Sequence, residues 1–590
     1  MPRERVVITD FSAGEITEGY AGRIDLQLYR RAAAELRGVV VRPDGGVTRR
    51  KPTMHVRSGH AFTPAAGGLT TPGNTPGFIL YSFQDGTNRV PFLAFVDSPN
   101  LIIRNMQTHT EATATTALEE GEALKTSGAF CAEDNFTTQT VNLWTPGHAE
   151  ILDLHTNVTT NRISRQIGTV FQNRLITADR EFGRLYFSVP LDLLNNDLTE
   201  IIEIDDGEGG TTEIVVATGA LDIRPDFYGV ESVRWIKSRG SLYVGTDQGE
   251  YEVSSAYAAF NGEPGGVMVT KLSSIGTTEA EFFGGNMVMI KDSRIVEMMY
   301  DARAHSYQTR SRMELQKNAP IVQMAVIEYG SHRYLFALDV RRVLWCLTAS
   351  PSTEVAGWTR MEEDVWSIFS FDQDMYVVRG VDGDFSIECI GMDNLHLRGD
   401  RSAMEALAFE NLDMYRDRGA FITVYDGEVT GDRLPANTEC QVWKYEDPGY
   451  AFVGDVTTNG DGELWATYLA ATGDLGGDAL VWAAPNEGNE FVSRIKSLPI
   501  ETSTIYGPGL GVPTRIHRIM VLVEETSAFR YRVTGSDWQI WQVDEPYSGP
   551  VNLTTGGSNV TQACVEIESY GDHPLTVLSI QADVTKEGHV

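Results

Sequence analysis

A repeated hairpin pattern occupies residues 77–395. Each unit consists of a strand, a tight polar turn and a second strand. Clear copies are SLYVGTDQGEYEVS from Ser241, NMVMIKDSRIVEMMY from Asn286, RYLFALDVRRVLWCL from Arg333 and DMYVVRGVDGDFSIECI from Asp374. Their starts lie 45, 47 and 41 residues apart. This period is typical of β-propeller blades, and about seven blades fit in the region. A sandwich array or several barrels would give a similar spacing.

An earlier copy is interrupted. The segment VFQNRLITADREFGRLYFSV from Val170 precedes Ser241 by 71 residues, and the interval holds a second hairpin pattern at 201–216. Removing that insertion restores a similar period. The sequence therefore predicts a blade that carries an inserted hairpin.

The remaining segments complete a mainly β fold class, a β-propeller of about seven blades followed by a β-sandwich/barrel-like C-terminal domain. We predict an N-terminal basic arm at 1–60, the propeller at 77–396, a connector helix at 397–418 and a C-terminal β domain at 419–590. The helix is expected because Met404, Leu407, Ala408 and Leu412 follow a 3.6-residue spacing. Residues 61–76 are rich in Gly, Pro, Ala and Thr, which indicates a linker.

Charge is distributed unevenly along the chain. The net charge is -33, yet residues 1–57 hold 11 basic and 7 acidic residues, leaving 37 basic and 74 acidic residues for the rest. Lys and Arg supply most of the affinity of proteins for phosphate backbones. The acidic body therefore argues against tight DNA binding, although it permits double-stranded DNA to pass without sequence-specific binding.

Chemical motifs are scarce. The five cysteines form no CxxC pair and are expected to be reduced core thiols, and the histidines form no HExxH motif. No apolar stretch approaches the length of a membrane-spanning helix, and residues 1–15 are too polar for a secretion signal. We expect no catalytic residues, no cofactor and no metal site. The acidic turns at 205, 381 and 459 match only fragments of calcium loops.

The N-terminal segment FSAGEITEGYAGRIDLQLYRRAAAELRGVVVRPDGGVTRRKPT resembles the opening of the tail nozzle family, the tail tubular protein B-like proteins of short-tailed bacteriophages. In this family an Asn usually stands at the position of Gly38, a Gln at that of Asp44, and Pro-Gly at Lys51-Pro52. Stretches from Phe171 and from Ser497 are also similar to the family. The residues that carry the N-terminal likeness are Phe11, Gly14, Glu15, Gly22, Arg23, Asp25, Leu26, Tyr29, Leu36, Arg42, Pro43, Gly45, Gly46, Arg49, Arg50 and Thr53.

The resemblance implies a structural virion protein, not an enzyme. It implies a propeller-based subunit in a homo-oligomer of six copies that forms the gated DNA-exit channel of the virion tail. Expected neighbours are the tail adaptor or tube protein and the tail fibres. Assembly would take place in the host cytoplasm.

Two sites follow from these expectations. Arg23, Asp25, Arg42, Arg49 and Arg50 are expected to form an assembly clamp, with exposed arginines that pair bidentately with carboxylates of a neighbouring subunit or of an adjacent tail protein. An exposed flexible leader is the alternative.

The acidic tip of the inserted hairpin, with Asp205, Asp206 and Glu208, is a possible channel gate. A hairpin on the outer rim of the propeller, without a role in gating, would have the same sequence features.

Two other functions remain open. Aromatic loops such as WATYLAATGD at 465 fit a tail adhesin that contacts the host surface. Glu362, Glu363 and Asp364, beside Trp358 and Trp366, could serve a polysaccharide-degrading tailspike, but a solvated acidic turn between blades is the favoured explanation.

Overall fold

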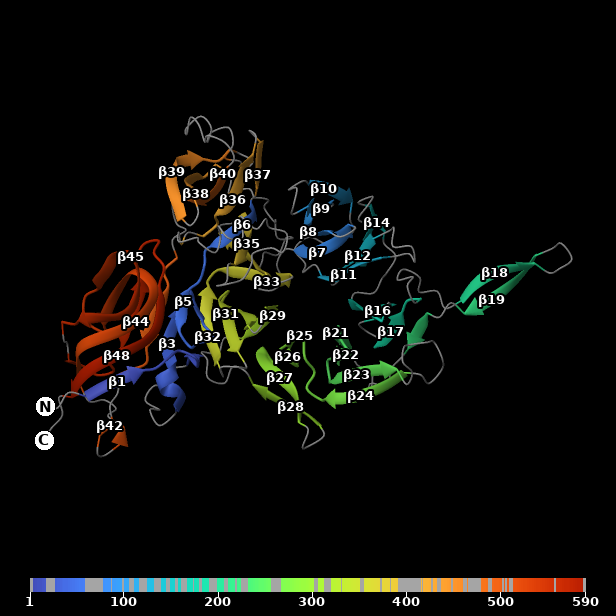
Figure 1. The fold of residues 1–590 in the computed structure, drawn as a ribbon. Coiled ribbons are helices and arrows are strands. Elements are labelled where there is room, and N and C mark those ends of the chain that lie inside the picture. The colour runs from blue at the N-terminus through green and yellow to red at the C-terminus, as the bar shows by residue number, and fades with distance from the viewer. Residues whose placement is uncertain are drawn as a thin grey trace. The chain divides into compact units, whose positions relative to one another are not determined.

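The computed structural model describes a mainly β chain, as the sequence predicts (Figure 1). Residues 1–3, 17–26, 59–77, 391–414 and 587–590 lie outside the description, as do the inter-strand loops drawn in grey. In the described part, the helical structure is one 3-10 helix, η2 (Gln27–Arg31). No described helix is both long and apolar enough to cross a membrane.

The chain divides into two compact units. Unit 1 comprises residues 1–61 and 313–590, and unit 2 comprises residues 62–312. Unit 1 thus contains both ends of the sequence.

Unit 2 consists of five four-stranded antiparallel sheets in chain order. Their strands are β7 (Phe78–Asp85), β8 (Asn88–Asp97), β9 (Asn100–Asn105) and β10 (Glu111–Thr115); β11 (Lys125–Cys131), β12 (Gln139–Trp144), β13 (Ala149–Asp153) and β14 (Val158–Thr160); β15 (Ile167–Phe171), β16 (Arg174–Asp179), β17 (Arg184–Phe187) and β20 (Leu221–Ile223); β21 (Val233–Arg239), β22 (Ser241–Thr246), β23 (Glu250–Ser255) and β24 (Val267–Ser273); β25 (Glu279–Phe283), β26 (Asn286–Lys291), β27 (Arg294–Asp301) and β28 (Ser306–Ser311).

Consecutive sheets of unit 2 meet through their first strands. Strand β11 lies against β7 and β15, β15 lies against β21, and β21 lies against β25. Apolar side chains fill the space between the third and fourth sheets, where Ile176 and Leu185 pack with Leu242 and Val253. These two sheets therefore bury their facing sides against each other.

The inserted hairpin is confirmed. Strands β18 (Thr199–Asp205) and β19 (Thr211–Ala217) pair only with each other and lie between β17 and β20 of the third sheet. Asp205 ends β18, opposite Thr211. Asp206 and Glu208 lie outside the described residues, so the gate remains a prediction.

Unit 1 continues the four-stranded pattern twice. Strands β29 (Ile321–Tyr329), β30 (His332–Asp339), β31 (Leu344–Ser350) and β32 (Val355–Glu362) form one antiparallel run. The next sheet joins β33 (Val365–Phe371), β34 (Asp374–Val381) and β35 (Asp384–Ile390) to β6 (Thr53–Ser58) from the start of the chain. The last repeat is thus completed by an N-terminal strand.

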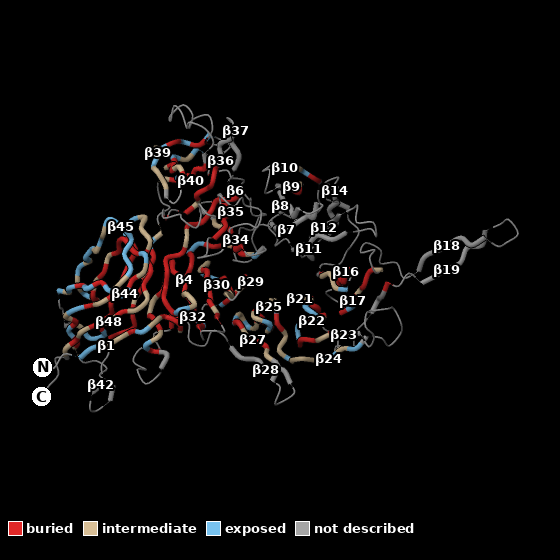
Figure 2. Tube along the Cα trace, in the orientation of Figure 1, coloured by how far each residue is buried: buried red, intermediate tan, exposed pale blue. Residues whose placement is uncertain are grey.

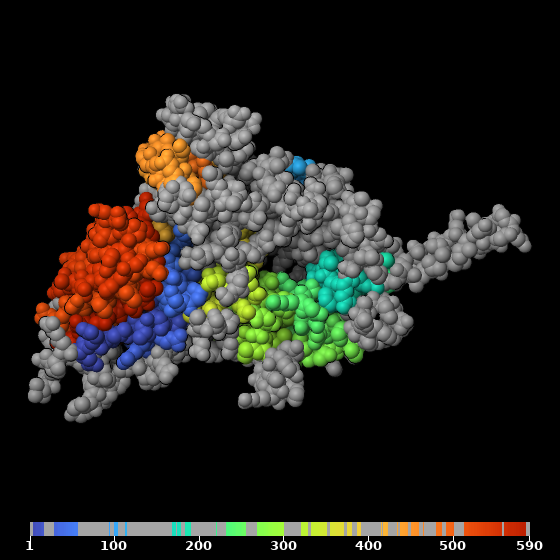
Figure 3. Space-filling view, in the orientation of Figure 1, coloured from blue at the N-terminus to red at the C-terminus, as the bar shows by residue number. Residues whose placement is uncertain are grey.

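A sandwich-like domain unites both ends of the sequence, as the adjacent blue and red surfaces in Figure 3 show. Its core contains Phe11, Leu36, Ile495, Phe529 and Ile567. Strand β1 pairs with β48, β3 with β41, and β5 with β48. Its strands are β1 (Glu4–Ile8), β2 (Gly14–Glu15), β3 (Ala32–Arg37), β4 (Val39–Val41), β5 (Val47–Arg49), β41 (Arg494–Ser497), β44 (Thr514–Val533), β45 (Gln539–Thr554), β46 (Asn559–Val560), β47 (Val565–Ser569) and β48 (Thr576–Lys586), and a separate hairpin follows β41, β42 (Ser503–Thr504) with β43 (Gly507–Pro508).

A smaller five-stranded sheet lies between these parts in sequence. It contains β36 (Ala420–Tyr425), β37 (Glu428–Gly431), β38 (Glu439–Glu446), β39 (Gly449–Thr457) and β40 (Ala479–Pro485). The region 419–590 therefore contributes to two separate β structures.

The predicted N-terminal arm is not an arm. Residues 4–8, 14–15, 32–41 and 47–58 contain strands that pair with the sandwich or with β35. Several of their apolar side chains, among them Ile8, Leu36 and Val47, belong to the sandwich core. The error arose because these strands are short and their partners lie hundreds of residues away. The predicted connector helix falls largely outside the described residues.

Candidate functional site

The arginines expected to project from the arm are buried. Arg49 ends β5, and Arg50 lies between β5 and β6, with its side chain 0% exposed. Arg42 is only partly exposed and pairs with Glu524 and Asp44 of the same chain. Arg23 and Asp25 lie outside the described residues. The exposed clamp is therefore wrong for Arg49 and Arg50, because burial keeps them from a neighbouring subunit.

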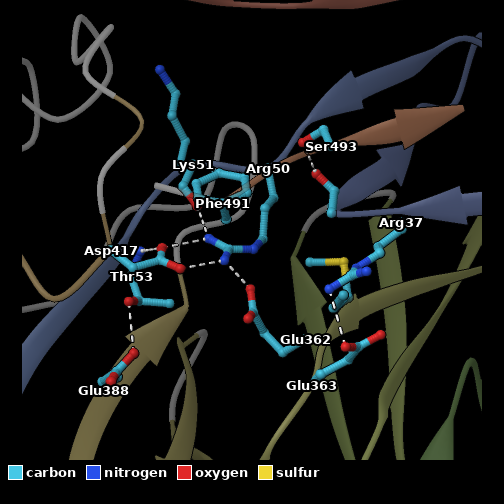
Figure 4. Close-up of polar contacts among 12 residues, drawn as sticks. Arg37, Arg50, Lys51, Thr53, Glu362, Glu363, Glu388, Asp417, Phe491 and Ser493 are labelled. Atoms are coloured by element: carbon cyan, nitrogen blue, oxygen red, sulfur yellow. Dashed lines mark hydrogen bonds and ion pairs between the residues drawn. The ribbon is translucent and has the colours of Figure 1, made fainter. Parts of the chain in front are cut away.

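Arg50 is the centre of a buried network that we call the charge junction (Figure 4). Its two terminal nitrogens donate to the two carboxylate oxygens of Asp417 at 2.8 and 2.7 Å. It also forms an ion pair with Glu362, and its guanidinium lies 3.7 Å from the ring centroid of Phe491. The bidentate geometry expected for this arginine exists, but its partner belongs to the same chain.

The same junction holds β35 and the beginning of β36. The Thr53 hydroxyl donates to Glu388 at 2.7 Å, and the Thr53 backbone N–H donates to Asp417 at 2.8 Å. Arg418 donates to Glu388 at 2.9 Å. The charge junction comprises Arg50, Thr53, Glu362, Arg379, Glu388, Asp417 and Arg418, which come from six separate places in the sequence.

Charge balance explains why these groups can be buried. Three arginines face three carboxylates, and Arg379 contacts all three acids, pairing with Glu362 and lying 3.5 Å from Glu388 and 3.6 Å from Asp417. Burial alone would raise the pKa of Asp417, but Arg50, Arg379 and the Thr53 N–H together lower it to about 2. Arg379 and Arg418 likewise lower the pKa of Glu388 against the effect of burial.

Arg49 stabilises a second contact between the two ends of the chain. It donates to the carbonyl oxygens of Gly571, His573 and Phe491 at 2.9, 2.7 and 2.7 Å. Its guanidinium also lies 4.4 Å from the ring centroid of Tyr415. Burial lowers the pKa of Arg49 to about 10. Arg49 therefore acts as an internal link to the backbone of the C-terminal strands.

An open pocket of about 520 Å³ borders the charge junction. It is lined by several arginines and carboxylates, among them Arg37, Glu362, Glu363 and Arg379. Glu362 pairs with Arg50 and Arg379, and Glu363 pairs with Arg37 at 3.0 Å. The carboxylates considered for glycoside hydrolysis thus already have arginine partners, an arrangement typical of a structural network.

The other sequence motifs show no further site among the described residues. The four described cysteines, Cys346, Cys389, Cys440 and Cys564, are buried thiols that form no disulfide, as predicted, and burial raises the pKa of Cys440 to about 12. In the described part of the chain, no cluster of three or more His, Cys, Asp or Glu side chains is placed to hold a metal ion.

Sequence reasoning missed Glu388 and Asp417. They lie 335 and 364 residues from their partner Thr53. No local pattern connects residues this far apart. An acidic residue within an otherwise apolar strand, such as Glu388 between Ile387 and Cys389, was the one available signal.

The charge junction predicts that acid destabilises the protein. Carboxylates with a lowered pKa contribute stability above the unfolded value of about 4, and this contribution is lost as the pH falls toward the folded value. For Asp417 the loss extends down to about pH 2. Glu15, whose pKa is raised by burial, acts in the opposite direction.

We therefore expect the thermal midpoint to change little between pH 7 and about 5, and to fall steeply between about pH 4 and 2. Scanning calorimetry across this range measures it. Asp417→Asn should lower the midpoint at pH 7 and reduce its further fall in acid. If the thermal midpoint of Asp417→Asn fell in acid as steeply as that of the unmodified protein, the role given to Asp417 would be contradicted.

Comparison with known proteins identifies no family. No family model and no curated protein matches the chain. Among solved structures, the mitotic checkpoint complex aligns with a TM-score of 0.34 at 10% identity, over 58% of this chain and 93% of that chain. Raptor from Chaetomium thermophilum aligns with a TM-score of 0.34 at 9% identity, over 56% of this chain and 30% of that chain. Hydrazine synthase from Kuenenia stuttgartiensis aligns with a TM-score of 0.32 at 9% identity, over 54% of this chain and 97% of that chain. Likenesses this low carry no inference about function.

Proposed function

We propose that this chain is a structural virion protein, a subunit of the tail nozzle of a short-tailed bacteriophage, and not an enzyme. Six copies of it would form a ring around a gated DNA-exit channel at the distal end of the tail. The tail adaptor or tube protein and the tail fibres would be its neighbours in the virion.

The observation that carries this proposal is the role of the N-terminal residues that resemble the nozzle family. Phe11 and Leu36 belong to the sandwich core. The Glu15 carboxylate accepts a hydrogen bond from the backbone N–H of Leu36 at 2.9 Å and forms an ion pair with Arg360 at 3.0 Å. Arg49 and Arg50 connect the sandwich to distant segments. The described motif residues thus serve architecture, which is expected of a structural protein.

One departure from the family pattern also has a physical explanation. Gly38 has a φ of +61°, in the left-handed region that Gly and Asn adopt most readily. The family's usual Asn at this position suits the same backbone. The substitution therefore leaves the turn between β3 and β4 compatible with the resemblance.

We further propose that the repeat region closes as a seven-bladed β-propeller. Five four-stranded sheets in unit 2 and two four-stranded runs in unit 1 give this number. Completion of the last sheet by β6 supports closure, because joining the two ends of a repeat region within one blade fastens a propeller. The inserted hairpin β18–β19 would then extend from the third blade.

Electron cryomicroscopy of the purified chain and of a virion that contains it tests the function. We expect a closed ring of about six copies on the tail axis, as the resemblance implies. Monomers or trimers at the tail periphery would instead support a host-binding adhesin.

One observation favours the adhesin as a second candidate. In the five-stranded sheet, Phe421, Trp482, Trp443 and Phe452 lie opposite one another on four adjacent strands. The first three are buried, and the row ends at Phe452, which is 56% exposed. Exposed aromatic rings offer stacking surfaces to apolar or sugar ligands.

If the chain binds host glycans through this row, Phe452→Ala should weaken binding at least about tenfold without altering ring assembly. A glycan array followed by calorimetric titration measures this. Val492→Ala, another exposed apolar position, is the matched control. Absence of glycan binding by the unmodified protein would remove the adhesin proposal.

A further inference from the structure

One face of the sandwich is charged although the opposite face is apolar. Residues alternate along each strand, so that Leu36, Ile495, Ile567 and Tyr531 enter the core. Their neighbours on β3, β41, β47 and β44 point to the other face. These neighbours are Glu35 and Arg37, Arg494 and Lys496, Glu566 and Glu568, and Arg530 and Arg532.

Strand register places these charges in two rows. Arg37, Arg494, Glu568 and Arg530 lie directly opposite one another on successive strands. The second row contains Glu35, Lys496, Glu566 and Arg532. An ion pair between Arg494 and Glu566 at 2.7 Å connects the rows, and Arg532 pairs with Glu566 at 2.7 Å within the second row.

The two signs of charge lie at different depths. The side chains of Glu566 and Glu568 are 3% and 8% exposed, whereas those of Arg37 and Arg530 are 47% and 38% exposed. Arginines above buried carboxylates present their guanidinium groups to solvent. Arg37 is an exception, because its partner Glu363 is 45% exposed. Over Glu566 and Glu568 a partner meets cations first, although the chain as a whole has a net charge of -33.

Apolar groups continue this face at its edge. Trp538 lies beneath Arg530 and Arg532, whose guanidiniums are 5.0 and 4.4 Å from its ring centroid. Ile540 pairs with Arg530 across the strands and is 54% exposed. Trp and Arg are enriched among the residues that contribute most to protein interfaces. We call Arg37, Arg494, Lys496, Arg530, Arg532, Trp538 and Ile540 the basic face.

A complementary acidic surface lies on β45. Gln542 pairs with Ala528 and Tyr547 pairs with Thr526, so residues 543–546 bulge away from β44. Asp544 and Glu545 of this bulge are exposed, in the pale blue stretch of β45 in Figure 2. Neither forms an ion pair with another described residue. We call these two residues the acidic ridge.

We propose that the basic face of one copy docks the acidic ridge of a second copy of this chain. Opposite charges give the contact its orientation, and Trp538 with Ile540 supplies apolar area that can be buried. The proposal rests on the proposed function only for the presence of neighbouring copies. Nucleic acid is a poorer occupant, because the acidic remainder of the chain repels phosphates.

Zero-length carbodiimide crosslinking of the assembled full-length protein tests the contact. Lys496 is the one amine on the basic face, and its 3.9 Å pair with Glu566 provides an internal control within one copy. Mixing ¹⁴N- and ¹⁵N-labelled protein before assembly distinguishes crosslinks between copies by mass. We expect mixed-label crosslinks that join Lys496 to Asp544 or Glu545.

Neutralising the ridge gives a second measurement. Asp544→Asn/Glu545→Gln should abolish the mixed-label crosslink, retain the Lys496–Glu566 crosslink and weaken assembly at least about tenfold in low salt. Glu446→Gln/Asp455→Asn, which neutralises two exposed acids of the five-stranded sheet, should leave assembly unchanged.

The outcomes separate this proposal from the nozzle function. Rings that assemble without any inter-copy crosslink at Lys496 overturn the contact alone. Crosslinks from Lys496 to a different tail protein, or binding of double-stranded DNA lost on neutralising Lys496, also overturn it. A chain that remains monomeric at every concentration overturns the ring as well.

Discussion

Replacement of Arg50 by Met should destabilise unit 1 by about 3–5 kcal/mol, because it leaves Asp417 and Glu362 buried without their principal cation. Removing one member of a buried ion network costs far more than the network contributes as a whole. Chemical denaturation of the full chain, followed by tryptophan fluorescence, measures the change.

Arg37→Met is the matched control. Its ion pair with Glu363 is about half exposed on both sides, and such surface pairs contribute less than about 1 kcal/mol. The double variant Arg50→Met/Asp417→Asn should recover part of the loss, because it removes one uncompensated charge. Equal stabilities for Arg50→Met and Arg37→Met would show that the charge junction does not hold the unit together.

Gly14→Ala should be similarly damaging, with an expected loss of more than about 4 kcal/mol. Gly14 has a φ of +69°, and an added Cβ would lie 2.2 Å from the backbone nitrogen of Trp358. The position of the Cβ is fixed by the backbone of residue 14 and the nitrogen belongs to the backbone of Trp358, so the contact cannot be relieved by a side-chain rotation. Strand β2 would have to separate from β32, to which it pairs at Trp358.

Gly571→Ala isolates the conformational part of this cost. Gly571 has a φ of +58°, but its added Cβ would meet its nearest neighbour at an ordinary 3.6 Å. We expect a loss of about 1–2 kcal/mol there, from the left-handed backbone alone. Thermal unfolding of the two variants measures the difference, and a Gly14→Ala protein no less stable than Gly571→Ala would refute the proposed clash.

The repeat region was predictable because its signals are local. The hairpin expected from Asn286 is β26 with β27, and the insertion expected at 201–216 is β18 with β19. Alternation and turn residues within about 15 positions suffice to locate such pairs. How the repeats close is not local, and periodicity alone could not determine it.

The N-terminal segment could not be predicted in the same way. Val39, Val40 and Val41 are all buried, so β4 shows no alternation. Arg49 and Arg50 resembled surface residues because arginine is rarely fully buried without a partner. Their partners, among them Asp417, Glu362 and the carbonyl of Gly571, could be found only from the tertiary structure. The sequence correctly predicted that Arg50 pairs with a carboxylate. The carboxylate was expected in a neighbouring subunit, whereas Asp417 belongs to the same chain.

The pairing of β1 with β48 has a consequence for biosynthesis. Glu4 lies opposite Val584, so β1 is synthesised long before the strand that pairs with it. Contacts of such long sequence separation form slowly, and the unpaired edges of β1, β3 and β6 remain open to wrong partners in the meantime. Unit 2 needs no residue from outside 62–312 to complete its five sheets. It can therefore fold while the nascent chain is still growing, whereas unit 1 must depend on chaperones or rapid completion to avoid aggregation.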